Sequence, residues 1–130
     1  RGLSLAATQS SLREIISMST NAGAQVVLLG MRMPPNYGID YAKRFAAMYQ
    51  GLAHEKSVKL VPFFLQGLDD VEQFFQPDRI HPNQRAQTLL LENVWPVRVD
   101  HDTRFVAFGI TVARHMITGV KNGYRVACFG

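Results

Sequence analysis

The sequence of 130 residues predicts one α/β domain in which parallel strands alternate with helices. The apolar residues follow the order helix, strand, helix, strand, helix over residues 5–94. The first strand, QVVLLG at 25–30, is apolar on both faces. Strands of this kind belong to parallel sheets, because helices cover both sides of such a sheet.

The first predicted helix precedes this strand. Residues at helical spacing form its apolar face: Leu5, Thr8, Leu12, Ile15 and Ile16. Ser4 or Ser11 is a candidate N-cap, and Glu14 follows Ser11 at the capping-box spacing. Gly23 suits the left-handed residue that commonly follows a helix end. The helix is therefore expected to end just before the strand at 25–30.

The rest of the α/β pattern follows a loop at 31–38, where two prolines lack amide donors. A second helix is predicted over 40–56, with Asp40 as its N-cap. Its apolar stripe consists of Tyr41, Phe45, Met48, Tyr49 and Leu52. A second strand is predicted at 57–61. Residues 63–82 are predicted to be loop, and residues 83–94 a third helix that Pro96 ends.

Residues 98–130 differ from the part before them and are expected to be an extension to a domain of residues 1–97. Residues 104–120 are apolar without a helical or alternating period. Asn122 and Gly123 indicate a turn, and residues 124–129 have the composition of a short strand. We expect no chemistry in this extension.

Composition and charge exclude several classes of function. The 14 basic and 10 acidic residues give a net charge of +4, spread along the chain without a basic stripe, so no nucleic-acid partner is expected. The single Cys128 excludes an internal disulfide and a cysteine-based zinc cluster. No apolar run predicts a membrane span, and no segment has the pattern of a signal peptide. Because the first residue is Arg1, we expect a processed product or a piece of a longer protein.

A metal site is weighed at Asp100, His101, Asp102 and His115, whose side chains are all metal-ligand types. The favoured interpretation is a solvated loop. We therefore expect neither a metal nor another cofactor.

The stretch PDRIHP at 77–82 carries the candidate chemistry. An Asp three residues before a His can fold back, so that Asp78 meets Nδ1 of His81 and leaves Nε2 as a general base. Both residues follow the second parallel strand, and ligands of open α/β sheets bind at the carboxyl ends of strands. On spacing alone, the favoured alternative is that Asp78 caps a turn and His81 caps the third helix.

Three blocks in order resemble the SGNH/GDSL hydrolases, and especially the bacterial arylesterase and multifunctional thioesterase–lysophospholipase branch. The blocks are AQVVLLGMRMPPNYG at 24–38, VPFFL at 61–65, and DRIHP at 78–82 followed by AQ at 86–87 and NVWP at 93–96. The resemblance covers roughly residues 1–97. It implies part of a flavodoxin-like three-layer α/β/α sandwich, hydrolysis of acyl or aryl esters and thioesters by a Ser-His-Asp triad, and a periplasmic or secreted location.

The same resemblance implies roles for single residues. His81 corresponds to the general base and Asp78 to its orienting acid. The substrate pocket corresponds to the loop after the first strand: Met33, Pro34, Pro35, Asn36 and Tyr37. Their apolar side chains with few polar atoms suit an acyl or aryl pocket. From the residues alone, the favoured interpretation of this loop is a rigid connection with Tyr37 packed on the core.

The sequence lacks the Gly-Asp-Ser-Leu block that holds the nucleophile of these hydrolases, and it lacks their oxyanion-hole Gly and Asn. We therefore expect the C-terminal half of such an enzyme, without its N-terminal strands and inactive alone. The strand at 26–29 is expected to keep an open apolar edge, where the missing half would pair. The alternative is a non-catalytic, truncated relative that binds a lipid or acyl group, or another protein.

Overall fold

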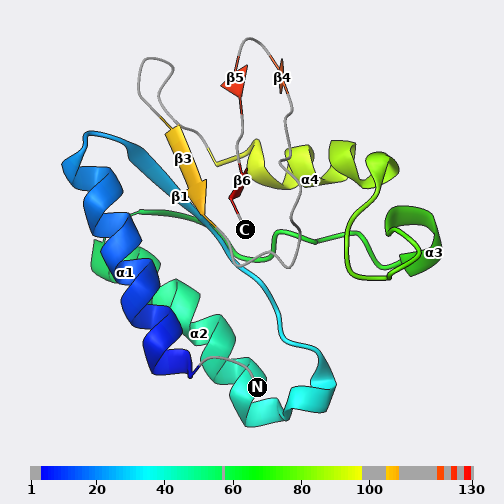
Figure 1. Ribbon diagram of the computed structural model, residues 1–130, viewed down its shortest axis with the longest axis horizontal. Helices are drawn as coiled ribbons and strands as arrows, with labels where there is room; N and C mark the ends of the chain where they lie inside the picture. The colour runs from blue at the N-terminus through cyan, green and yellow to red at the C-terminus, as the bar shows by residue number, and fades with distance from the viewer. Residues whose placement is uncertain are drawn as a thin grey trace.

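The computed structural model describes residues 4–56, 58–97, 105–108, 120–121, 124–125 and 128–129. Its centre is a parallel sheet with the strand order β2-β1-β3-β6, as Figure 1 shows for β1 and β3. The strands of this sheet are β1 (Gln25–Leu29), β2 (Lys59–Val61), β3 (Phe105–Phe108) and β6 (Cys128–Phe129). A separate antiparallel pair joins β4 (Val120–Lys121) and β5 (Tyr124–Arg125).

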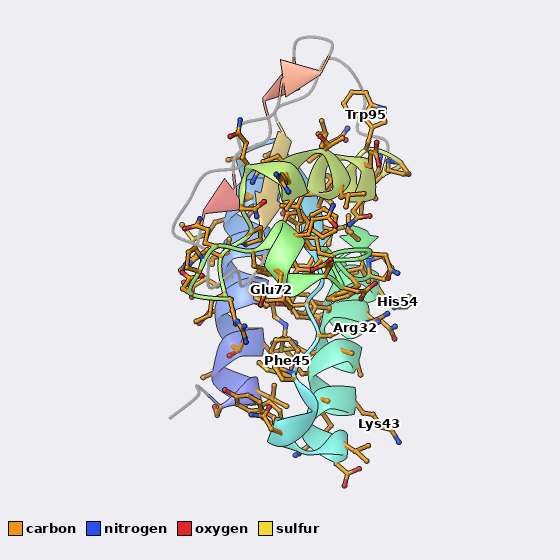
Figure 2. All side chains as sticks on the ribbon, turned by 90° about the vertical axis from the view of Figure 1, so that its right-hand side faces the viewer. Arg32, Lys43, Phe45, His54, Glu72 and Trp95 are labelled. Carbon is orange, nitrogen blue, oxygen red and sulfur yellow. The ribbon has the colours of Figure 1, made fainter. Side chains whose placement is uncertain are left out.

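Helices cover both faces of β1. The helices are α1 (Leu5–Asn21), α2 (Ile39–Lys56), α3 (Val71–Phe74) and α4 (Gln87–Val94), with short 3-10 turns η1 (Pro35–Tyr37) and η2 (Gln84–Ala86). Helices α1 and α2 lie side by side on one face of the sheet, and α4 lies on the other (Figures 1 and 2). The prediction of an α/β fold with parallel strands is therefore confirmed.

The side chains of β1 alternate between two cores. Val26 and Leu28 pack among residues of α1 and α2, whereas Val27 and Leu29 pack among residues of α4 and of the loop after β2. All four side chains are at most 4% exposed. Burial of each one contributes about 1.5–3 kcal/mol to folding. The expectation of a strand buried on both faces is met, and it explains why one short strand organises both layers.

The two ends of α1 are capped as the sequence predicts, whereas α2 starts at a different residue from the one predicted. The Ser4 hydroxyl accepts a hydrogen bond from the Ala7 amide at 3.1 Å, and Gly23 adopts a φ of 80° just after the helix. Asp40 lies inside the first turn of α2 and is not its N-cap. The Gly38 carbonyl instead accepts the hydrogen bond of the Ala42 amide, so the helix begins earlier than predicted.

The prediction of an open edge on β1 is wrong in this structure. β3 pairs with β1 in parallel, from Gln25 opposite Phe105 to Leu28 opposite Phe108. β6 in turn pairs with β3. The backbone groups of a strand buried as deeply as β1 need hydrogen-bond partners on both sides, and residues 105–108 supply them on this side.

Two further predictions about loops need correction. Residues 71–74, predicted to be loop, form α3, because the Asp70 carboxylate accepts a hydrogen bond from the Gln73 amide and caps one helical turn. The single strand predicted at 124–129 consists of two short strands, β5 and β6. The turn expected at 122–123 and the metal ligands weighed at 100–102 and 115 lie outside the described residues. Within the described part of the chain, no helix is long and apolar enough to span a membrane.

The loops after β1 and β2 leave the sheet in contact with each other at Gly30. Its amide donates to the Val61 carbonyl at 2.7 Å, and its carbonyl accepts from the Phe64 amide at 2.9 Å. A Cβ atom at this position would lie 2.5 Å from the Pro62 carbonyl oxygen. Only glycine permits this approach, which sets where the two loops begin.

We predict that Gly30→Ala lowers the free energy of unfolding by about 1–3 kcal/mol, because the added methyl group forces two backbone segments apart. Gly51→Ala is the matched control, since a Cβ atom there meets nothing within 4 Å and the residue lies inside α2. The control should raise stability by about 0.5–1 kcal/mol. Urea unfolding followed by circular dichroism compares the two. Equal effects of both substitutions would show that the contact at Gly30 is not restrictive.

Candidate acid–base site

Asp78 and His81 lie on a short closed loop between α3 and η2. The loop is closed at its base by an antiparallel bridge between Phe75 and Pro82. Inside it, the Gln76 amide donates to the His81 carbonyl, and the Arg79 amide donates to the Gln76 carbonyl, each at 2.8 Å. These backbone bonds hold the two candidate residues close together before their side chains interact.

The Asp78 carboxylate divides its two oxygens between the backbone and the imidazole. Oδ1 accepts hydrogen bonds from the amides of Ile80 and His81, each at 3.0 Å. Oδ2 lies 2.5 Å from Nδ1 of His81. Asp78 therefore caps the turn and contacts the imidazole at the same time, so two interpretations that the sequence presented as alternatives are both present.

The alternative that His81 caps the third helix is wrong. The cap is Asn83, whose side-chain oxygen accepts a hydrogen bond from the Arg85 amide at 2.8 Å. A histidine at position 81 is too early for this role, because the helical turns begin at residue 84. The His81 side chain is 25% exposed and that of Asp78 is 43% exposed, so the pair lies at the surface of the loop.

The hydrogen bonds at Asp78 determine the protonation of the pair. The hydrogen bond from His81, followed by those from the backbone amides of Ile80 and His81, lowers the pKa of Asp78 to about 2. The carboxylate is therefore ionised at neutral pH and can only accept hydrogen bonds. A neutral imidazole must then carry its proton on Nδ1, and Nε2 becomes the proton-accepting atom. This is the tautomer that a general base requires.

Asn83 and Arg79 hold the loop in this shape, and sequence reasoning missed both roles. The Asn83 side-chain amide donates to the carbonyls of Gln73 and Phe75, at 2.8 and 3.1 Å. Arg79 has a φ of 57°, in the left-handed region, and its guanidinium pairs with Glu72 at 2.7 Å. Asn83 at the start of a predicted helix signals a cap, but no local pattern predicts bonds across a loop. A left-handed arginine has no sequence signal at all.

The segment before the closed loop is fastened to α4. The Asn93 side-chain amide donates to the carbonyls of Phe64 and Gln66, at 2.9 and 2.8 Å. Asn93 lies in the block NVWP that carries part of the resemblance, and this contact is its structural role here. The acid–base loop is thereby attached to the same core that covers one face of β1.

The residues of the predicted substrate loop differ in their burial. Met33 is half-buried against the α1 and α2 core, whereas Pro34 and Asn36 are exposed. Tyr37 is 56% exposed, so the interpretation that it packs in the core is wrong; its ring stacks on Tyr41 at a centroid distance of 6.1 Å. Pro35 lies in η1, and the structure does not describe its side chain. Figure 1 shows η1 and the loop after α3 at the same side of the molecule but apart from each other.

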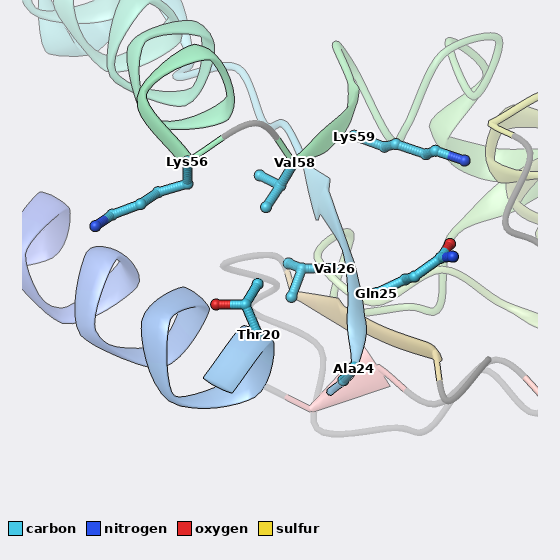
Figure 3. Close-up of a pocket in the computed structure, with 7 residues that line it drawn as sticks. All are labelled: Thr20, Ala24, Gln25, Val26, Lys56, Val58 and Lys59. Carbon is cyan, nitrogen blue, oxygen red and sulfur yellow. The ribbon is translucent and has the colours of Figure 1, made fainter. Parts of the chain in front are cut away.

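A hollow of about 270 Å³ lies at the other end of the sheet, between the end of α1 and the start of β1 (Figure 3). Its lining residues are Thr20, Ala24, Gln25, Val26, Lys56, Val58 and Lys59. None of them is an acid–base pair or a nucleophile with a neighbouring base. The hollow therefore does not belong to the candidate site.

No protein-family model matches the chain. Curated relatives do match it. Esterase TesA of Pseudomonas aeruginosa is 44% identical over 96 residues, which are 74% of this chain and 48% of the relative. An arylesterase of Vibrio mimicus is 36% identical and covers 78% of this chain and 50% of its own length. Thioesterase 1/protease 1/lysophospholipase L1 of Escherichia coli is 36% identical, over 79% of this chain and 51% of the relative's length.

The solved structures that are similar to this chain include those of esterases. The crystal structure of TesA has a TM-score of 0.69 at 43% identity, covering 75% of this chain and 54% of that one. AlinE4, described as an esterase of the SGNH-hydrolase family, has a TM-score of 0.57 at 35% identity. The match covers 74% of this chain and 51% of AlinE4. The chain therefore spans about half the length of the relatives that it matches.

We predict that the carboxyl of Asp78 titrates near pH 2 in the native chain and at higher pH in His81→Ala. The substitution removes the largest cause of the lowered pKa but leaves the two backbone hydrogen bonds. Because the folded pKa lies below the ordinary value of 3.8, the stability that this group contributes is present above about pH 4 and is lost as the pH falls toward 2. Carbon-detected NMR of the Asp78 carboxyl measures both titrations. An unchanged titration in His81→Ala would contradict the assignment of the cause.

Proposed function

Over the matched three quarters of its length this chain belongs to the SGNH hydrolase family, and on that premise we propose that it supplies the acid–base half of an ester or thioester hydrolase. In this proposal His81 is the general base and Asp78 orients it. The substrate is an acyl or aryl ester or thioester. The observation that carries the proposal is the contact of Asp78 Oδ2 with His81 Nδ1 at 2.5 Å.

The proposed chemistry uses the tautomer that Asp78 fixes. Nε2 of His81 takes the proton of a serine hydroxyl as the serine oxygen attacks the ester carbonyl, and it later returns that proton to the leaving alcohol or thiol. The ionised Asp78 stabilises the imidazolium that forms between these steps. A water molecule then attacks the acyl-serine carbonyl and gives a proton to Nε2, and the imidazole returns that proton to the serine oxygen as the carboxylic acid leaves. The proposal includes no metal or other cofactor.

We propose that the serine nucleophile is not among the described residues. The serines within them are Ser4, Ser10, Ser11, Ser17 and Ser19. All of them lie in α1 or cap it, and α1 packs on the face of β1 opposite to α4. The loop that holds His81 lies beside α4 through η2, so none of these hydroxyls is placed to meet it. We infer that the 130 residues alone do not hydrolyse esters and that a complementing segment brings the serine and the oxyanion hole.

Two further parts of the proposal rest on the resemblance. The hydrolase segment is proposed to comprise residues 1–97, with residues 98–130 as an extension. A periplasmic or secreted location is proposed from the same likeness. The loop with Met33 and Tyr37 is proposed to form one wall of the substrate pocket, completed by the complementing segment.

The test is complementation. We predict that the chain alone does not cleave p-nitrophenyl butyrate above background. Co-expression with the part of Pseudomonas aeruginosa esterase TesA that this chain does not cover should give an active assembly, because binding that favours only the folded form stabilises it. Asp78→Asn should lower the rate by about 10⁴-fold through the wrong imidazole tautomer, and His81→Ala by at least as much. Asp69→Asn, an exposed acid on the same segment, is the matched control and should leave the rate unchanged.

The pairing of β3 with β1 favours the second candidate function, a non-catalytic binding module, because the edge on which a complementing strand would pair is already covered. Testing a chain that ends at residue 97 in the same assay distinguishes the two candidate functions. Faster assembly and higher activity with the shortened chain support the hydrolase proposal. A full-length chain that remains monomeric beside the added segment, with no activity in either length, supports the binding module.

A further inference from the structure

Asn83 holds the end of α3 beside the acid–base loop. Its backbone amide donates a hydrogen bond to the Phe74 carbonyl at 2.8 Å. Its side-chain amide donates to the carbonyls of Gln73 and Phe75, at 2.8 and 3.1 Å. The last carbonyls of a helix have no partner inside the helix and need donors from elsewhere. One residue supplies such donors to three consecutive carbonyls at the end of α3.

On its other side, Asn83 is joined to the core of the domain. Its side-chain oxygen accepts a hydrogen bond from the Arg85 amide at 2.8 Å, and its carbonyl accepts one from the Ala86 amide at 3.2 Å. Ala86 and Leu90 are at most 1% exposed, within the core that covers one face of β1. Asn83 therefore connects a packed part of the domain to the exposed segment before the acid–base loop.

The acid–base pair lies between the two segments that Asn83 connects. The chain leaves α3 at Phe75, passes through Asp78 and His81, and returns at Pro82, which forms an antiparallel bridge with Phe75. The distance of 2.5 Å between Oδ2 of Asp78 and Nδ1 of His81 depends on how the two ends of this loop meet. Because a hydrogen bond weakens steeply when its geometry changes, a shift of either end would weaken this contact.

We propose that Asn83 is a positioning residue for His81. By holding the two ends of the loop together, Asn83 keeps Nδ1 of His81 in contact with Asp78, so that Nε2 remains the proton-accepting atom. Asn83 acts through the loop and not on the substrate. The consequence for the rate rests on the proposed hydrolase function, whereas the effect on the protonation of His81 is a property of this chain alone.

Asn93 offers a matched control. Its side-chain amide also donates to two carbonyls, those of Phe64 and Gln66, and like Asn83 it is half-buried. These carbonyls belong to the segment directly after β2 and do not flank the acid–base loop. Serine removes the side-chain amide at either position, and at position 83 it keeps an oxygen that caps η2 about as well as asparagine does. Both variants lose two hydrogen bonds, but only Asn83→Ser should disturb His81.

Nitrogen-15 NMR of the histidine ring in the full chain, at mildly alkaline pH, measures the tautomer. Asn83→Ser should change the ratio of the Nδ1 and Nε2 tautomers of His81 about tenfold in favour of Nε2, because the charge-assisted hydrogen bond to Asp78 is weakened. Asn93→Ser should leave this ratio unchanged. Both variants should lower the melting temperature by about 2–8 °C, since each leaves two carbonyls without their donor.

The titration of Asp78 gives a second measurement on the same variants. The hydrogen bond from His81 is the largest cause of the lowered pKa of Asp78, so Asn83→Ser should raise this pKa from about 2 toward the ordinary 3.8. Arg79 and Glu72 are the charged pair of the same loop and α3, and neither serine variant adds or removes a charge there. A raised pKa in Asn83→Ser alone therefore reports a change of geometry.

The rate in the complemented assembly shows the consequence for catalysis. Asn83→Ser should lower kcat by about 10–100-fold at an unchanged KM, because a displaced base affects the reaction and not the binding of the ester. If the assembly with the native chain is inactive, the hydrolase proposal fails, while the tautomer of His81 still decides the role of Asn83.

The proposal is overturned if Asn83→Ser keeps the native tautomer of His81, or if Asn93→Ser changes it as much. Asn83→Thr repeats the comparison if the serine variant does not fold, because threonine also keeps an oxygen for the cap and suits the extended backbone of residue 83. Failure of both variants to fold, beside a folded Asn93→Ser, would show that Asn83 supports the whole domain and would also overturn the proposal.

Discussion

Burial of β1 on both faces is the constraint on which the rest of this structure depends. Val26 and Leu28 anchor α1 and α2 on one side, and Val27 and Leu29 anchor α4 and the loop after β2 on the other. A strand enclosed in this way has to satisfy its backbone groups within the sheet, which accounts for β2 on one edge and β3 on the other. The carboxyl end of β1 then becomes the edge where the functional loops start.

From that edge, two short-range contacts determine the geometry of the site. Gly30 brings the loops after β1 and β2 together, and in these loops the Arg32 guanidinium carbon lies over the Phe63 ring, 4.4 Å from its centroid. Further along, Asp78 uses one oxygen for the backbone of its turn and the other for His81. The carboxylate that shapes the loop is the one that orients the imidazole, so folding of the loop and the chemistry proposed for it depend on the same group.

Much of this arrangement follows from the sequence. The QVVLL run predicts β1, because only a strand covered on both faces is uniformly apolar. Gly23 predicts the end of α1, and Ser4, one of two candidate caps beside Ser11, lies at its start, since caps act within one turn. The spacing of Asp78 and His81 predicts their contact for the same reason. The resemblance to SGNH hydrolases added the chemical meaning, which the spacing of two residues does not contain.

The features that the sequence did not predict are tertiary. The left-handed Arg79 is stabilised by Glu72, seven residues away, and the bonds of Asn83 cross the loop. The pairing of residues 105–108 with β1 joins segments about eighty residues apart, and neither segment signals the other. In these cases the deciding contact lies outside the window in which propensity acts. Tyr37 is a local exception: it is exposed, and its ring stacks on Tyr41 only four residues along the chain.

The claim that Asp78 fixes His81 as a base is tested most directly by the protonation of the imidazole nitrogens. Nitrogen-15 NMR of the histidine ring at mildly alkaline pH distinguishes a proton on Nδ1 from one on Nε2. The account predicts that His81 in the native chain carries its proton on Nδ1, and that Asp78→Asn shifts the population toward Nε2. A native His81 with its proton on Nε2, or one whose tautomer is the same in Asp78→Asn, would contradict the account.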